Sequence, residues 1–287
     1  MEMRVAAIQL NSTADKGRNL EGGERLVRAA AADGAALIAL PEKWNVLGDA
    51  EALREGAEPL DGATMSAASS WARELGIHLL AGSIAERAEG REKLFNSSAL
   101  IGPDGEVQAR YRKIHMFDVD VGGVSYRESE SEEPGEEIVA AEIGGSSEVV
   151  MLGMTVCYDL RFPELYRILA LRGATVLSVP SAFTFETGKD HWEVLLRARA
   201  IENQSFVIAP NQTGEAPPHY RSYGHSMIVD PWGEVLADAG DGECFVAADL
   251  DLEIAERVRS NLPSLANRRP ASYRWPPPAG SEVPSHA

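Results

Sequence analysis

The chain has 287 residues, and 44 acidic against 27 basic side chains give it a formal net charge of −17. This balance argues against the basic surfaces that bind nucleic acid or anionic membranes, so neither partner is expected. Two cysteines are too few for a disulfide framework of the secreted type, and no leader peptide is evident. No apolar run approaches the roughly 20 residues that span a bilayer. We therefore expect a cytoplasmic protein.

Short apolar runs alternate along the chain with amphipathic stretches of helical period. The pattern predicts strands at 5–10, 36–40, 77–84, 149–157, 175–180, 205–210 and 245–250, and helices at 20–32, 65–75, 163–172 and 192–203. Turn residues predict two hairpins, 94–101 with 107–114 and 226–230 with 234–236. Asp251 is the predicted N-cap of a closing helix.

Interleaved strands and helices, together with hairpins, predict helices packed on mixed sheets in a layered α/β sandwich. No linker divides the chain, so a single domain is expected over residues 1–274. The acidic run 128–137 is predicted to be a loop, and the proline-rich residues 275–287 a tail that extends from the body.

Cys157 is the strongest candidate for a nucleophile. It ends the apolar strand VVMLGMTVC, and YDLRFPELYRIL follows as a turn into a helix. A nucleophile at such a corner is presented beside free backbone N–H groups that can hold an oxyanion. A buried core cysteine is the alternative. Cys244 lies in a late strand without such a turn and is interpreted as structural.

Two charged residues could assist a thiol. Glu42 follows a buried strand in LALPEKW, where partial burial would suit a general base. Lys113, in ARYRKIHMFD, is predicted on a hairpin strand, where a fixed ammonium could stabilise charge on a carbonyl oxygen. Taken singly, each is better explained as a solvated surface residue.

Together, the segments PEKW, YRKIHMFD and CYDLRFPELYR resemble the three signature segments of the nitrilase superfamily of carbon–nitrogen hydrolases. The resemblance extends from about residue 5 to 273. Other segments, among them HWEVLLRARAIENQ and YGHSMIVDPWGEVLA, are similar to the branch that contains deaminated glutathione amidases and omega-amidases. The resemblance implies a four-layer αββα sandwich, paired as a homodimer, and a catalytic triad of Glu42, Lys113 and Cys157.

The resemblance also implies roles for further residues. Glu128 matches a second glutamate that positions the lysine and the reacting water, although its place in the acidic run also fits a solvated face. The backbone N–H near Tyr158 would receive the oxyanion. Arg161 would pair with a substrate carboxylate, Phe183 would supply an apolar wall, and Thr187 a hydroxyl. Helix bracing by Arg161 and core packing by Phe183 are the alternatives.

The expected activity is hydrolysis of the terminal carboxamide of a small carboxylate-bearing substrate, of the deaminated glutathione or 2-oxoglutaramate type, through a thioester. No cofactor is expected, and no histidine spacing indicates a metal site. The loop 212–221 departs in composition and could reshape the pocket mouth. Alternatives are an N-carbamoyl amino acid or aliphatic amide hydrolase, a nitrilase, a catalytically silent scaffold, and a redox protein using Cys157 and Cys244.

Overall fold

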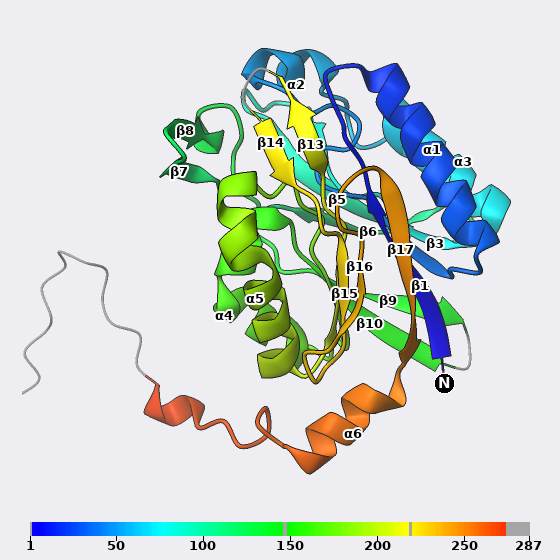
Figure 1. Ribbon diagram of the computed structural model, residues 1–287, viewed down its shortest axis with the longest axis vertical. Helices are drawn as coiled ribbons and strands as arrows, with labels where there is room; N and C mark the ends of the chain where they lie inside the picture. The colour runs from blue at the N-terminus through cyan, green and yellow to red at the C-terminus, as the bar shows by residue number, and fades with distance from the viewer. Residues whose placement is uncertain (1, 146–147, 218–219, 274–287) are drawn as a thin grey trace, which may run out of the picture.

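The computed structural model describes residues 2–145, 148–217 and 220–273 (Figure 1). These residues form two large sheets, two short ribbons and the helices that cover the sheets. The first sheet has the order β17 (Cys244–Asp251), β1 (Glu2–Gln9), β2 (Leu37–Ala39), β3 (His78–Leu80), β5 (Phe95–Ile101) and β4 (Ile84–Glu86), with β6 (Val107–Arg112) also paired to β5. The second has the order β16 (Val235–Asp238), β15 (Met227–Val229), β12 (Phe206–Ala209), β11 (Val176–Ser178), β10 (Glu148–Met154) and β9 (Ala140–Gly145).

Helices lie on the outer face of each sheet, as Figure 1 shows. The first sheet is covered by α1 (Lys16–Ala32) and α3 (Ala63–Leu75), and the second by α4 (Pro163–Leu171) and α5 (Phe185–Asn203). The remaining elements are α2 (Ala50–Gly56), α6 (Glu253–Asn261), the ribbon β7 (Asp118–Val121) with β8 (Val124–Arg127), the ribbon β13 (Thr213–Ala216) with β14 (Tyr220–Tyr223), and 3₁₀ turns at Glu128–Glu130, Cys157–Arg161 and Pro270–Ser272.

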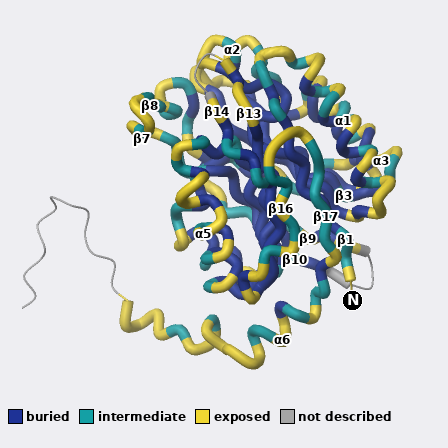
Figure 2. Tube along the Cα trace, in the orientation of Figure 1, coloured by how far each residue is buried: buried dark blue, intermediate teal, exposed yellow. Residues whose placement is uncertain are grey.

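The alternation of side chains along β1 explains why the helices and sheets form four layers. Val5 and Ala7 point into a core shared with the second sheet, whereas Ala6 and Ile8 point into a second core beneath α1 and α3. Successive strand residues face opposite sides, so a strand that is apolar throughout requires a cover on both faces. The buried strands and exposed outer helix surfaces in Figure 2 follow from this arrangement. The predicted αββα sandwich is confirmed.

Several predicted elements differ from those observed. The strand predicted over 77–84 is two strands, β3 and β4, because Gly82 turns the chain with φ +52° between them. The N-cap of α6 is Leu252 rather than Asp251, although the Asp251 carboxylate still accepts a hydrogen bond from the Glu253 N–H at 3.1 Å. Helix α5 begins at Phe185, earlier than predicted, and α2, β9 and both ribbons were not predicted.

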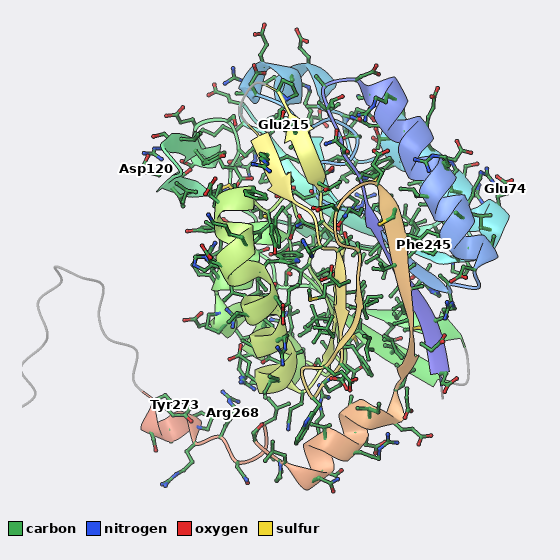
Figure 3. The ribbon with its side chains drawn as sticks, in the orientation of Figure 1. Glu74, Asp120, Glu215, Phe245, Arg268 and Tyr273 are labelled. Carbon is green, nitrogen blue, oxygen red and sulfur yellow. The ribbon has the colours of Figure 1, made fainter. Side chains whose placement is uncertain are left out.

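The described chain ends with α6 and a short segment that follows it. Beyond β17, α6 packs against the body through buried Ala255 and through Arg259, which donates to the Ala174 carbonyl at 2.7 Å. The segment after α6 runs away from the main body in Figure 1, and Figure 3 places Arg268 and Tyr273 at its far end. The predicted domain boundary at residue 274 and the tail 275–287 lie outside the described residues. Within the described ranges, the helices are all too short or too polar to cross a membrane.

Candidate active site

Glu42 lies at the end of a short segment that leaves β2, and its side chain is 4% exposed. One carboxylate oxygen, Oε1, accepts hydrogen bonds from Asn96 Nδ2 at 2.8 Å and Lys113 Nζ at 3.1 Å. The other oxygen accepts from the Ala182 N–H at 2.8 Å. Trp44 anchors the segment, since its indole N–H donates to the Ala81 carbonyl at 2.9 Å. The carboxylate is therefore held in one orientation, and the surface-loop alternative is wrong.

Lys113 is the first residue beyond β6, and its N–H continues the ladder by donating to the Asn96 carbonyl at 2.9 Å. Its ammonium contacts both oxygens of Glu128, at 2.9 and 2.8 Å, as well as Glu42. Burial alone would lower the pKa of Lys113, but the charges of Glu128 and Glu42 outweigh it and raise the pKa well above its usual value. Lys113 is thus a buried, permanently charged group and not a solvated strand lysine.

Glu128 lies on the 3₁₀ turn that follows β8, and its side chain is 9% exposed. Besides Lys113, its carboxylate accepts from the Phe117 N–H at 2.7 Å and Asn96 Nδ2 at 3.3 Å. Burial would raise the pKa of Glu128, yet the Lys113 and Lys43 ammonium groups lower it below its usual value. Its surroundings rule out the solvated-face interpretation of this residue, which fits only its exposed neighbours in the acidic run.

Cys157 stands at the corner between β10 and α4, and its backbone adopts φ +46°. Such a conformation costs a non-glycine residue of the order of 1–3 kcal/mol and is common at functional corners. The Cys157 N–H donates to the Pro180 carbonyl at 2.9 Å, and the thiol lies beside the Glu42 carboxylate. Burial and the neighbouring Glu42 carboxylate raise the pKa of the thiol well above its usual value, against the opposing effect of Lys113. The resting sulfur therefore carries its proton.

Asp159 holds the backbone at Cys157 in place through hydrogen bonds. It was not identified as a site residue from the sequence. It is fully buried and accepts hydrogen bonds from the Tyr111 hydroxyl at 2.6 Å, the Val156 N–H at 2.8 Å and the His115 N–H at 3.2 Å. The carboxylate thus joins the residue before Cys157 to the strand that carries Lys113. The sequence did offer one signal for this role, because Asp159 lies two residues after the candidate nucleophile.

Glu42, Lys113 and Cys157 line a cavity of about 290 Å³ together with all the other candidate site residues. Its walls come from α2, from the β7–β8 ribbon and from the segment after Pro180. Figure 3 shows Asp120 on the outer side of this ribbon, which projects from the body. The candidate site residues that share the cavity are Glu42, Lys113, Glu128, Cys157, Tyr158, Arg161, Phe183 and Thr187. Residues 212–217, 220 and 221 of the divergent loop are not among its lining residues, and the described part forms the β13–β14 ribbon instead.

The residues expected at the substrate end form one wall. The Arg161 guanidinium lies 5.2 Å from the centre of the Phe183 ring, and its Nη1 is 3.3 Å from His191 Nδ1. Phe183 also packs against Trp192, so it serves the core as well as the cavity. The Thr187 hydroxyl is 2.8 Å from that of Thr184. The wall therefore offers a cation, an aromatic face and a hydroxyl to a ligand.

Three more residues of this region had no interpretable sequence signal. Asn96, buried on β5, donates to both Glu42 and Glu128 and so links the two carboxylates. Lys43 and Glu132 form a further buried ion pair and also line the cavity. The local sequence around Asn96 indicates only a strand, that around Lys43 a loop, and that around Glu132 an acidic surface. The three side chains come together only in the folded protein.

Both cysteines are free thiols, and Cys244 begins β17 away from the cavity lining. Among the described residues, no cluster of histidine, cysteine and acidic side chains is arranged to hold a metal ion.

Comparison with known proteins places the chain in a family. Residues 4–260 match the carbon-nitrogen hydrolase family. The chain is 42% identical over 266 residues to the deaminated glutathione amidase of Synechocystis sp. (92% of this chain, 97% of that one), and 39% identical over 271 residues to the human omega-amidase NIT2 (94% and 96%). The crystal structure of Saccharomyces cerevisiae Nit3, a member of branch 10 of the nitrilase superfamily, superimposes with a TM-score of 0.82 at 32% identity, covering 91% of this chain and 94% of Nit3. The resemblance inferred from the three segments is confirmed.

Proposed function

Because the chain belongs to the carbon–nitrogen hydrolase family, we propose that it is a cysteine-dependent amidase that releases ammonia from the terminal carboxamide of a small carboxylate-bearing substrate. The substrate is of the deaminated glutathione or 2-oxoglutaramate type, as the names of the relatives suggest. The observation that carries the proposal is the convergence of Glu42, Lys113 and Cys157 at the cavity: a thiol beside a fixed carboxylate and a buried ammonium.

Acylation follows from this geometry. Because the resting thiol is protonated, Glu42 removes its proton as sulfur attacks the amide carbon, and the carbonyl π electrons move to oxygen. Lys113 and the N–H near Tyr158 stabilise the oxyanion; the first N–H groups of the 3₁₀ turn have no acceptor within it. One such donor contributes about 10²–10³ in rate. The C–N bond then breaks, and Glu42 gives the proton to the leaving nitrogen, which departs as ammonia.

Deacylation uses the same residues in reverse. Glu42 takes a proton from water as the water oxygen attacks the thioester carbon. The C–S bond breaks, and the proton returns to sulfur, which regenerates the thiol and releases the carboxylic acid. Glu128 remains ionised throughout and holds the Lys113 ammonium at the carbonyl oxygen. Every proton and electron pair is accounted for by these groups and water.

The wall of the cavity supports a carboxylate-bearing substrate. The Arg161 guanidinium would pair with the substrate carboxylate in a bidentate geometry. Phe183 would cover the aliphatic chain, and the Thr187 hydroxyl would donate to a carbonyl or hydroxyl of the substrate. We expect the protein to act in the cytoplasm as a homodimer, and light scattering of the purified chain tests the oligomeric state.

The proposal is tested by ammonia release from 2-oxoglutaramate, deaminated glutathione, an N-carbamoyl amino acid, an aliphatic amide and a nitrile. We expect turnover of one of the first two, and its loss in Cys157→Ala while the circular dichroism spectrum stays that of the wild type. Cys244→Ser is the matched control and should retain activity. Turnover of only the N-carbamoyl amino acid, the aliphatic amide or the nitrile would instead assign the protein to the corresponding class of hydrolase. Activity in Cys157→Ala would refute the mechanism, and silence across the panel would favour a scaffold.

A further inference from the structure

A second lysine lies beside the catalytic charges. Lys43 directly follows Glu42 and adopts φ +50°, a conformation that turns its side chain into the interior. The side chain is 7% exposed, and its ammonium contacts Glu132 Oε1 at 2.6 Å and Glu128 Oε1 at 3.5 Å. Strained backbone at a non-glycine residue persists only where the surroundings hold it in place. Lys43 is thus fixed between two carboxylates at the cavity wall.

Glu132, its main partner, is a buried acid within the acidic run. Its side chain is 1% exposed, and its Oε2 has no hydrogen-bond partner among the described residues. The charged groups that face it are Lys43, Glu128 and Lys113. Burial and the Glu128 charge raise the pKa of Glu132 to about 7, although Lys43 opposes them. The carboxyl therefore changes its charge near neutral pH, next to the reaction site.

These residues complete a row of alternating charge: Glu132, Lys43, Glu128, Lys113 and Glu42. Within this row, Glu128 forms ion pairs with both Lys113 and Lys43. The ion pairs of Lys43 join it to Glu132 and to Glu128, the carboxylate that also contacts Lys113.

We propose that Lys43 and Glu132 are positioning residues for the amidase reaction: Glu132 holds Lys43, and Lys43 holds the Glu128 carboxylate in place against Lys113. This inference rests on the proposed function for its kinetic meaning. Loss of Glu132 frees Lys43 to draw Glu128 away from Lys113, and loss of Lys43 leaves two carboxylates facing each other. In both cases the ammonium shifts from where the carbonyl oxygen is bound.

The first test is the kinetics of Lys43→Met, Glu132→Gln and the double variant on the amide that the wild type hydrolyses. Each single change should lower kcat by about 10- to 100-fold, as misplaced catalytic groups do, with KM within about twofold. Because the two residues act as a unit, the double variant should lose no more than the worse single one. The control is Glu58→Gln, which removes a carboxylate paired with Lys16 outside the cavity lining and should leave kcat unchanged.

The second test is independent of amide turnover: the rate of Cys157 alkylation by iodoacetamide against pH, with Cys244→Ser in every variant. The charged groups facing the thiol are Glu42 and Lys113. Lys43→Met removes a positive charge and should move the midpoint to higher pH, whereas Glu132→Gln removes a negative one and should move it lower, each by about half a unit or more. A packing defect would move both midpoints the same way.

The outcomes separate the two proposals. Opposite midpoint shifts, with kcat reduced and KM retained, support the positioning role. Midpoints that shift together or stay fixed, additive losses in kcat, or changes confined to KM overturn it. If the wild type hydrolyses no substrate of the panel, the proposed function fails, and the alkylation midpoints alone decide whether Lys43 and Glu132 act on the site.

Discussion

At the scale of single residues, Glu42, Lys113 and Cys157 line one cavity, and buried partners that are distant in sequence surround them. Glu42 and Cys157 stand at the ends of predicted apolar strands, and Lys113 stands near the end of a predicted hairpin strand; strand ends are where buried polar groups can meet. Asn96 and Asp159, which hold the triad in place, lie inside segments whose pattern indicates only a strand and a turn. Their partners are distant in sequence, so no local signal exists.

Asp159 provides a residue-scale prediction. Asp159→Asn replaces an acceptor oxygen by an NH₂ group within a ring of donors, so it should lower the free energy of unfolding by about 2–3 kcal/mol. Tyr111→Phe removes one donor and should cost only about 1 kcal/mol. Urea denaturation measures both. Ammonia release should also fall in Asp159→Asn because the Cys157 corner loosens, and wild-type stability in this variant would contradict the role assigned to the carboxylate.

At the scale of elements, most strands of both sheets were predictable, β9 excepted, because apolar runs bounded by turn residues are typical of buried strands. The hairpins β5–β6 and β15–β16 were found from their turns. The β7–β8 ribbon was not found, although DVDV and VSYR alternate on either side of Gly122 and Gly123, which is a hairpin pattern. Its strands are four residues long and contain no fully buried side chain, so they carry less apolar signal than the strands of the two sheets.

Gly82 provides an element-scale prediction. A Cβ at this glycine would lie 2.1 Å from the Pro41 carbonyl oxygen, on the segment that carries Glu42. Gly82→Ala should therefore lower the free energy of unfolding by about 3 kcal/mol or more and reduce amide hydrolysis. Gly76→Ala is the matched control: its φ is also positive, +66°, but the added Cβ meets nothing within 4 Å, so about 1 kcal/mol is expected. Equal losses in urea denaturation would contradict the clash.

At the scale of the whole molecule, the charges buried at the site make stability depend on pH. The pKa of Glu132 is raised in the folded protein to about 7 from 4.5, so the folded state keeps a proton that the unfolded state has released. Stability from this group is fully present below about pH 4.5 and is lost as pH rises to about 7. The contribution of Glu128 to stability depends on pH in the opposite direction. Because its pKa is lowered in the folded protein, its contribution is lost only as pH falls.

We therefore expect urea denaturation to show a loss of stability in the wild type between pH 5 and pH 8 that Glu132→Gln lacks, a difference on the order of 2–3 kcal/mol. Glu58→Gln serves as the control and should keep the wild-type slope, since the pKa of Glu58 is lowered and its contribution changes only in acid. Parallel wild-type and Glu132→Gln curves over this interval would show that Glu132 does not titrate there.

The pairing of β1 with β17 has a consequence for how the protein is made. Glu2 lies opposite Asp251, so the outer edge of β1 stays open until β17, far along the chain, has been synthesised. Contacts so distant in sequence slow folding, and an open apolar strand edge invites pairing with other chains. On the ribosome, the nascent chain would expose β1 until β17 emerges. A chain that stops before Cys244 should therefore collect in inclusion bodies, although it contains Glu42, Lys113 and Cys157.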